Sequence, residues 1–358
     1  MFKTPIFVCV LTLFSTVLTA QERQVELIIS GLESPWAIEQ IDDQTLIITE
    51  KTGHVGLLNL SNKKYKRIAT IQESALHGQG GLLDVAVSPF APNTLYFTYS
   101  KHVKVGYETT LAITTLKENK LVNWRNLLIT QSNSDTGRHF GSRITFDDNY
   151  LFFSVGDRGV RDNGQDLSTH AGTIIRLHPD GRVPDDNPFA GQANAQPEIW
   201  SYGHRNPQGL FYDHQDKTLW SIEHGPRGGD EVNLIVKGQN YGWARASHGK
   251  EYWGPFSVGE AEELPGMESP KKVYTLSIAP SSLIFYRSKT YPELTGKLIA
   301  GALKLTHLNV LSVDEHQNIT HEERILSSLN ERIRDVLALK NGDILIATDE
   351  GNIYRLVP

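Results

Sequence analysis

The chain is dominated by short stretches of alternating apolar and polar residues, separated by turns rich in Gly, Asp and Asn. Alternation with a period of two is typical of strands with one buried face, and clear helical periodicity is hard to find anywhere in the chain. Several segments share one layout: an acidic or amide turn, an apolar strand, a polar break with Gly, and a second strand. These segments begin at Asp42, Asp147, His214 and Lys340.

Similar units that recur at irregular multiples of roughly 40–60 residues are typical of a β-propeller with insertions between its strands. This period predicts six blades, with five or seven as alternatives. The final strands, ILIATDEGNIYRLV, are expected to pair near the mature N-terminus and so remove a free sheet edge. A β-sandwich or β-helix would also give short strands, but a sandwich would need two domains and no Pro/Ser-rich linker divides the chain. We therefore predict an all-β, six-bladed β-propeller formed as a single domain by residues 21–358.

Long irregular stretches interrupt this pattern. Loops of such length are uncommon unless they are functional, and on a propeller we expect them to gather at one mouth of the channel. They are Ser132–Gly141, Arg158–Ala171, Pro184–Pro197 and His248–Met267.

The first twenty residues differ from the rest. Met1-Phe2-Lys3 gives a short positive start, Ile6–Leu18 is almost wholly apolar, and Ala20 precedes polar residues. These are the three parts of a secretory signal peptide, so we expect residues 1–20 to be removed and the protein to be periplasmic or secreted. A membrane anchor is the alternative, but the apolar run is shorter than the ~18–20 residues that span a bilayer.

Composition narrows the chemistry. The only cysteine, Cys9, lies in the expected signal peptide, so a mature chain would have no cysteine nucleophile, disulfide or thiolate zinc site. The formal net charge is −6, and the absence of any basic run argues against nucleic-acid binding.

His139 is the candidate general base. It lies on a loop before an expected strand, between Arg138 and Arg143, and nearby arginines lower a histidine's pKa and favour its basic form. Asp157 follows the next strand and could orient the ring, which is the usual arrangement for removing a hydroxyl proton. The alternative is that His139 is only a turn residue.

Several cations occur where expected strands meet loops. Arg205-Asn206 is held before Pro207, and this rigid turn would present a guanidinium fork beside an amide. Lys304 lies in GALK, and Arg332 and Arg334 would share one face of a strand. With Arg143 these residues make five cations, a set suited to a small molecule with several carboxylates. The alternatives are an ordinary Asn-Pro turn and solvated surface charges.

Gly225-Pro226 follows the expected strand LWSIEH, and Asp230-Glu231 follows shortly after. Gly and Pro expose backbone carbonyls, and carboxylates nearby would complete the oxygen-rich shell that calcium prefers. A solvated acidic turn is the alternative.

In these residues the chain resembles the soluble quinoprotein glucose and aldose sugar dehydrogenases. Its compact length is more similar to that of the bacterial aldose sugar dehydrogenases than to that of the longer glucose enzyme. These are six-bladed propellers that use pyrroloquinoline quinone (PQQ) and calcium. The resemblance covers nearly all of the mature chain. Its motifs, in order, are PWAIEQ, ITEKTG, GQGGLLDVAVSP, HFGSR, SVGDRG, EIWSYGHRNPQGL, EHGPRGGDEVNLIVKGQNYGW, GALK and ERIRD.

The resemblance implies roles for individual residues. His139 matches the base that takes the proton of the anomeric hydroxyl, and Asp157 looks like its supporting carboxylate. Gly225 and Pro226 match ligands of the catalytic calcium, and Glu231 and Tyr241 match ligands of a second, structural calcium. Together with the cation pattern, the resemblance predicts cofactor contacts from Gln79, Arg143, Arg205, Asn206, Tyr252, Ala302, Lys304, Arg332 and Arg334. The chain departs from the family pattern at Ser281-Ser282, where the family tends to have Ser-Gly.

The implied activity is oxidation of aldose sugars at C1 to lactones, with electrons passed on to an external acceptor. The substrate would be a small sugar and the protein a monomer or homodimer, with no membrane span in the mature chain. One alternative is a calcium-dependent propeller lactonase or other hydrolase. The other is a non-catalytic sugar-binding propeller.

Overall fold

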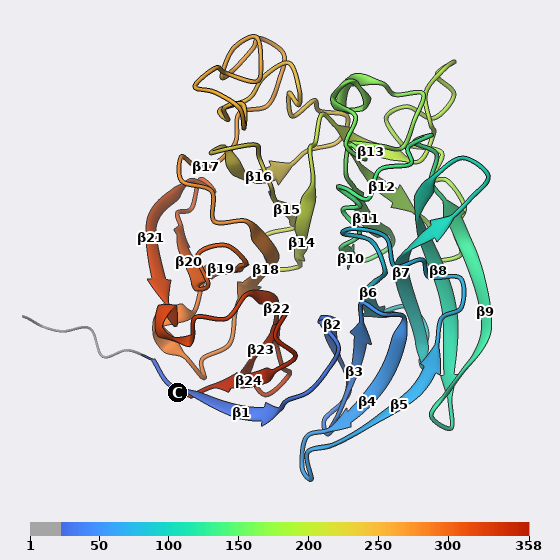
Figure 1. Cartoon of the computed structure of the whole chain (residues 1–358), viewed down its shortest axis with the longest axis vertical. Helices are drawn as coiled ribbons and strands as arrows, with labels where there is room; N and C mark the ends of the chain where they lie inside the picture. Colours follow the sequence, from blue (N-terminus) through green and yellow to red (C-terminus); the bar gives the residue numbers. More distant parts are fainter. Residues whose placement is uncertain (1–22, 358) are drawn as a thin grey trace, which may run out of the picture.

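A computed structural model describes residues 23–357. The predicted signal peptide and Cys9 therefore lie outside the described residues. Within that range the chain forms six four-stranded antiparallel sheets, arranged as blades in a ring around a central channel (Figure 1). The predicted all-β, six-bladed propeller is confirmed. No helix in residues 23–357 is long and apolar enough to cross a membrane.

The first three blades follow one another along the chain, and each begins with its innermost strand. Blade 1 contains β2 (Pro35–Asp42), β3 (Thr45–Glu50), β4 (His54–Asn59) and β5 (Lys64–Thr70). Blade 2 contains β6 (Leu82–Val87), β7 (Thr94–His102), β8 (Tyr107–Lys117) and β9 (Lys120–Ile129). Blade 3 contains β10 (Ile144–Phe146), β11 (Leu151–Val155), β12 (Thr173–Leu177) and β13 (Ile199–Tyr202).

The second half of the ring repeats this order. Blade 4 contains β14 (Pro207–Asp213), β15 (Thr218–Glu223), β16 (Asp230–Ile235) and β17 (Lys272–Tyr274). Blade 5 contains β18 (Pro280–Tyr286), β19 (Lys297–Ala302), β20 (Leu308–Val313) and β21 (Ile319–Ile325). Blade 6 contains β22 (Ile333–Ala338), β23 (Ile344–Thr348), β24 (Ile353–Leu356) and, as its outer strand, β1 (Val25–Ile29). Short 3-10 turns lie in the connections, at Arg161–Gln165, Pro292–Leu294 and Ser327–Leu329.

The ring is closed by pairing between the two ends of the described chain. β1 runs antiparallel to β24, with Val25 opposite Leu356 and Leu27 opposite Tyr354. This confirms the predicted pairing of the final strands near the N-terminus. Closure removes the exposed edge that a linear array of blades would leave.

The hydrophobic core is divided among the junctions between neighbouring blades. Each of six buried clusters combines residues from two adjacent blades, for example Phe97 of blade 2 with Ile47 of blade 1. The alternation in the sequence explains this arrangement, because each strand places apolar side chains on both faces of a blade that is covered by neighbours. Burial at these junctions thus fixes the angle of every blade relative to its neighbours.

The Arg143 side chain, from blade 3, crosses the channel and contacts each of the other five blades. Its guanidinium binds Asp84 of blade 2 at 2.9 Å and Asp335 of blade 6 at 3.0 Å. It also donates to the carbonyls of Gln208 in blade 4 and Ser281 in blade 5. In blade 1 it lies 4.4 Å from the centre of the Trp36 ring.

The outer strand of blade 6 offers a matched test of closure. Ile28 is 5% exposed and packs at the junction of blades 6 and 1, whereas Leu27 beside it is 48% exposed. We expect Ile28→Ala to lower the free energy of unfolding by about 2–5 kcal/mol, and Leu27→Ala by less than about 0.5 kcal/mol. Urea unfolding measures both, and equal losses would contradict a role for β1 in holding the ring closed.

Candidate functional site

His139 and Asp157 form a buried pair at the entrance to the channel. The His139 Nδ1 atom lies 2.6 Å from Asp157 Oδ1. His139 takes a left-handed backbone conformation (φ 53°), and its N–H donates to Gln79 Oε1 at 2.7 Å. The Gln79 side chain, for which the resemblance implies a cofactor contact, thus holds the loop in this strained conformation.

Asp157 is held rigidly as the acceptor of this pair. Trp243 Nε1 donates to its Oδ2 at 2.7 Å, and the Gly159 N–H donates to its Oδ1 at 2.7 Å. Its own N–H donates to the carbonyl of Arg205 at 2.8 Å. Because the carboxylate accepts these bonds, His139 is expected to carry its proton on Nδ1 and present the Nε2 lone pair.

The surroundings keep His139 neutral. Burial lowers the pKa of its imidazole, and the nearby Arg205 and Arg158 lower it further, while Asp157 raises it. Only 11% of the side chain is exposed. A neutral imidazole with an orienting carboxylate can act as a general base near neutral pH.

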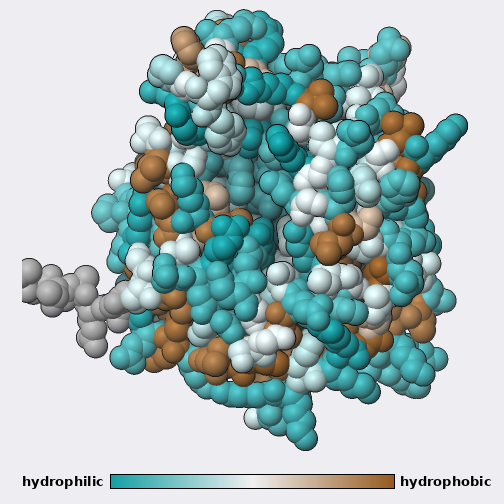
Figure 2. Space-filling view, in the orientation of Figure 1, coloured by the Kyte–Doolittle hydropathy of each residue, from teal (hydrophilic) through white to brown (hydrophobic). Residues whose placement is uncertain are grey.

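A cavity of about 250 Å³, here named the site cavity, lies beside this pair where the inner strands begin. Its polar lining includes Lys51, Gln79, Asn206, Gln208, His224, Arg332, Arg334 and Asp349. His139 adjoins it through Gln79 and through Phe140, the next residue, which also lines it. Figure 2 shows the surface hollowed near the centre of the ring, where hydrophilic residues gather.

Cations converge on one wall of the site cavity. Asp349 accepts hydrogen bonds from Arg332 at 2.9 Å and from Arg334 at 2.8 and 3.0 Å. Lys51 also lines the cavity and donates to the Gly78 carbonyl, and burial together with Arg334 lowers the pKa of its amine. Three cations against one carboxylate leave this wall positively charged.

The Arg205-Asn206 turn is anchored by Glu223. The Glu223 carboxylate accepts from the backbone N–H groups of both residues, at 2.7 and 3.3 Å. Asn206 then reaches the site cavity, while Arg205 lies next to it and donates to the His224 carbonyl. The predicted rigid turn is present, and its rigidity comes from a buried acid as well as from Pro207.

The remaining predicted cofactor residues do not line the site cavity. Arg143 is directed into the channel, where Asp84 and Asp335 bind it. Ala302 is fully buried at the end of β19, and Lys304 is exposed just beyond it. Tyr252 is 66% exposed on the 248–267 segment. Their assignment to the cofactor stays a prediction.

The four residues predicted to bind calcium line a single small cavity, here named the ion cavity. They are Gly225, Pro226, Glu231 and Tyr241. Its volume is about 10 Å³, close to that of one water molecule or one ion. His224 lines both this cavity and the site cavity, so the two adjoin. The resemblance implies two calcium ions, one bound by Gly225 and Pro226 and a second bound by Glu231 and Tyr241.

The ion cavity is lined by two acids, Glu223 and Glu231, and also by the cation Arg205. Burial and the neighbouring Glu223 raise the pKa of Glu231 to about 8. Next to both acids, Asn233 donates to each carboxylate, and its own Oδ1 is buried without a partner. The Tyr241 hydroxyl already bonds Leu234 and Val236, which leaves its backbone carbonyl for a ligand.

Gly225 is required by its surroundings. A Cβ atom placed there would lie 1.8 Å from the Gly229 carbonyl oxygen, so any side chain would displace the loop. The carbonyl-bearing turn is therefore packed against the loop that leads to Asp230. In residues 23–357 no group of three or more His, Cys, Asp or Glu side chains is arranged to hold a metal. A cation here would depend on backbone carbonyls.

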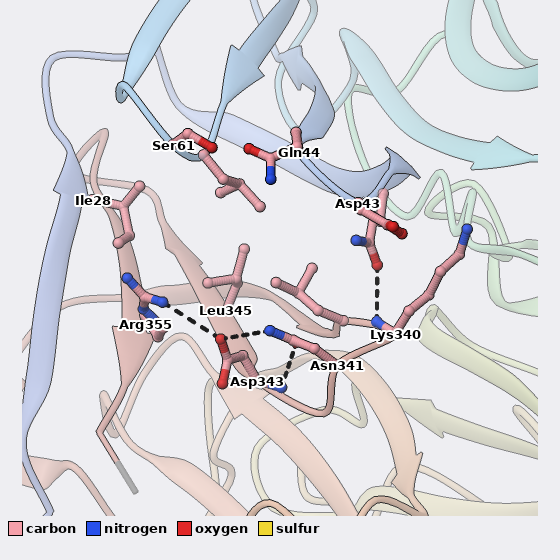
Figure 3. A pocket seen from close by; sticks show the side chains of 12 residues that line it. Ile28, Asp43, Gln44, Ser61, Lys340, Asn341, Asp343, Leu345 and Arg355 are labelled. Carbon is pink, nitrogen blue, oxygen red and sulfur yellow. Dashed lines mark hydrogen bonds and ion pairs between the residues drawn. The ribbon is translucent and has the colours of Figure 1, made fainter.

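Another cavity lies at the seam between blades 1 and 6 (Figure 3). A bond from the Lys340 N–H to Gln40 Oε1 joins its two walls, and an ion pair between Arg355 and Asp343 lies within the blade 6 wall. None of the predicted site residues lines it. We interpret it as part of the closure of the ring.

Sequence reasoning missed four residues that shape the site: Lys51, Glu223, His224 and Trp243. Lys51 lies in ITEKTG and His224 in EHGPRGG, so both belong to motifs of the resemblance, but the sequence predicted no role for either residue. Trp243 ends the motif QNYGW, and Glu223 ends a strand. Their side chains act on partners far away in the chain, which spacing alone does not reveal.

Residues 32–355 match the family model described as Glucose / Sorbosone dehydrogenase. The chain is 37% identical over 345 residues to aldose sugar dehydrogenase YliI of Escherichia coli K12, and the match covers 93% of this chain and 92% of that protein.

Solved structures agree. The crystal structure of the apo-form of the soluble aldose sugar dehydrogenase from Escherichia coli superimposes with a TM-score of 0.90 at 35% identity, covering 94% of this chain and 99% of that one. A PQQ-bound aldose sugar dehydrogenase from Streptomyces coelicolor gives a TM-score of 0.77 at 21% identity, covering 93% and 97% of the two chains. At that identity the second comparison shows a shared fold.

Asp157 offers a direct test of the electrostatics around His139. We expect Asp157→Asn to lower the pKa of His139 still further, because the hydrogen bond and the charge of Asp157 are the contributions that raise it. Nuclear magnetic resonance of labelled histidine measures this pKa. Asp162→Asn, on the exposed turn nearby, should leave it unchanged. A higher pKa in Asp157→Asn would contradict the arrangement.

Proposed function

The chain belongs to the glucose/sorbosone dehydrogenase family, and from this premise we propose that it oxidises aldose sugars at C1 to lactones, using PQQ and calcium. The observation that carries the proposal is the neutral His139–Asp157 pair placed beside a cavity whose far wall is cationic. A proton acceptor next to an anion seat is the arrangement that this oxidation needs.

The site cavity fits a small polyanion such as PQQ. Lys51, Arg332 and Arg334 would bind its carboxylates. Hydrogen bonds to Asp349 already hold the two arginines in position. Asn206 and Gln79 would bind its carbonyl and ring edges with their amides. The PQQ-bound Streptomyces coelicolor enzyme, with the same fold, supports the choice of this cofactor.

The ion cavity fits calcium. Calcium takes oxygen ligands in flexible geometry, and the cavity offers the carboxylate of Glu231 together with the exposed backbone of Gly225, Pro226 and Tyr241. Asn233, which does not line the cavity, donates to the Glu223 and Glu231 carboxylates and so holds both in place. Because the ion cavity adjoins the site cavity at His224, an ion here would be near a bound quinone.

His139 performs the protein's part of the reaction. Its Nε2 atom takes the proton of the C1 hydroxyl, while Nδ1–H stays bonded to Asp157, whose charge stabilises the imidazolium that forms. PQQ with calcium, when bound, would supply the electrophilic carbonyl that accepts the hydride from C1 as the C1–H bond breaks. The cationic wall orients this cofactor, and an external acceptor must then reoxidise it.

Cellular location is part of the same proposal. The charged start, apolar stretch and small residue at positions 1–20 support export to the periplasm or beyond.

His139→Gln tests the base. We expect kcat to fall by about 10²–10⁴-fold, because that is the usual contribution of general base catalysis, while PQQ binding is retained. Dye reduction with a panel of aldoses measures kcat, and quenching of protein fluorescence measures cofactor binding. His316→Gln, on an exposed turn, is the matched control. An unchanged kcat, or loss of PQQ binding in both histidine variants, would rule out the assigned role.

Calcium binding should depend on pH. Glu231, with its pKa raised to about 8, holds a proton below that pH and must release it to bind the ion. Affinity should therefore rise by up to about tenfold per pH unit between pH 6 and 8. Competition with a calcium indicator, in protein without quinone, measures it.

Two variants accompany this titration. Glu231→Gln should abolish the pH dependence and weaken binding, whereas Glu315→Gln, at the surface, should change neither. Equal affinities at pH 6 and pH 8 in the unmodified protein would show that Glu231 is not a ligand.

A further inference from the structure

The channel contains another cavity, separate from the site cavity. Residues further along the same inner strands line it, for example Glu39 of β2, Phe211 of β14 and Asp335 of β22. Residues nearer the start of these strands, such as Trp36 and Arg334, line the site cavity instead. The second cavity, here named the channel cavity, has a volume of about 190 Å³ and draws its walls from all six blades.

Negative charge exceeds positive charge around the channel cavity. Glu39, Asp84 and Asp335 are its acids, and Arg143 is the cation among the lining residues. Both aspartates bind the same Arg143 nitrogen, at 2.9 and 3.0 Å. The other guanidinium nitrogens donate to the carbonyls of Gln208 and Ser281. These contacts use four of the five guanidinium N–H donors, and none of them goes to Glu39.

Glu39 is poorly compensated. Among the described residues its only hydrogen bond comes from the adjacent Gln40 N–H, at 2.9 Å. Burial raises its pKa to about 8, Asp84 and Asp335 add to the rise, and Lys340 opposes it. A carboxyl group placed in this way carries a proton at neutral pH unless a cation takes its place.

An unused hydroxyl group also lies at the channel cavity. Ser282 lines it and is 2% exposed, and its Oγ atom is buried with no hydrogen-bond partner within residues 23–357. Buried polar atoms nearly always have a partner, so this one indicates that a ligand or water binds there. Ser282 is also the position at which the sequence departs from the family pattern.

The remaining walls are apolar. Phe146 and Phe211 contribute rings, and Ile38, Leu283 and Val336 contribute aliphatic side chains. A bare metal ion would find no group of three His, Cys, Asp or Glu ligands anywhere in the described chain. A ligand with one compact positive charge and a short hydrocarbon chain matches both parts of the cavity, because aromatic faces also attract cations.

We propose that the channel cavity is a binding site for a small primary alkylammonium ion, whose ammonium group bonds Glu39 and Ser282 while its alkyl chain packs against Phe146 and Phe211. The ammonium group supplies three donors, enough for the carboxylate, the hydroxyl and a water. This site is separate from the one proposed for sugar oxidation, because no residue lines both cavities.

Binding is coupled to protonation. The charged groups that face Glu39 are Asp84, Asp335 and Lys340, and Arg143 and Arg334 act on Asp335. Burial also raises the pKa of Asp335, and that of Asp84 to about 6, but both aspartates are paired with Arg143, so Glu39 is the group expected to change charge near neutrality. An incoming ammonium ion displaces its proton, so affinity should rise with pH up to about 8.

The experiment uses n-butylammonium as the probe and n-butanol as its neutral match. Titrations of the full-length mature protein without quinone, followed by saturation-transfer nuclear magnetic resonance, give dissociation constants at pH 6, 7 and 8. We expect butylammonium to bind at least about tenfold more tightly than butanol, and its affinity to rise about tenfold per pH unit over this range.

Variants locate the site. Glu39→Gln should reduce butylammonium affinity at least about tenfold and remove its pH dependence, and Ser282→Ala should reduce it several-fold. Glu315→Gln, at the surface, is the matched control and should change nothing. Thermal melting of each variant shows that it is folded.

Three results would overturn the proposal: no binding of butylammonium, equal binding of butanol, or binding unaffected in Glu39→Gln. Because the titrations need neither sugar nor quinone, these results are distinct from a failure of the dehydrogenase activity.

Discussion

The contacts of Arg143 set the geometry on which both halves of the channel depend. One guanidinium joins strands from blades 2, 4, 5 and 6 and packs on a ring from blade 1. Its acidic partners extend the network, since Asp335 accepts from the Ile38 N–H and Asp84 accepts from the Ile144 N–H. A buried ion pair of this kind contributes little net stability, yet removing one partner is costly because a charge is left uncompensated. Its role is therefore to fix the register of the inner strands, and with it the positions of the site residues at their starts.

The sequence was sufficient for the fold because propeller blades are local. Each blade is a run of hairpins, so alternating apolar residues and turn residues specify it. The closing pair of strands was predictable because the first and last strands would otherwise leave an unpaired sheet edge. The pairing of His139 with Asp157 was also predictable, because they flank one strand hairpin of blade 3. Arg143 shows the limit of this reasoning. A cation near a loop can serve a ligand or a buried acid, and the acids that bind it come from Asp84 and Asp335, which are remote in sequence.

Two partly buried acids have properties suited to binding cations. Glu231 and Glu39 both have their pKa raised to about 8, mainly by burial. Glu231 lines the ion cavity and Glu39 lines the channel cavity. The surroundings differ in what they offer beyond the carboxylate, namely backbone carbonyls in one case and hydrocarbon in the other. Because burial disfavours the ionised carboxylate, a bound cation would stabilise it. The other groups that line each cavity then determine which kind of cation fits.

The pairing of β1 with β24 has a consequence for how the protein is made. β24, the last strand of the described chain, completes the blade whose outer strand is β1, the first. Blades 1 to 5 can assemble from consecutive hairpins as the chain emerges, but blade 6 must wait for contacts between residues more than 300 positions apart, such as Glu26 and Arg355. Arg332, Arg334 and Asp349 all lie in or beside this blade. The cationic wall is therefore assembled last, and we expect binding of the proposed anionic cofactor to require the closed ring.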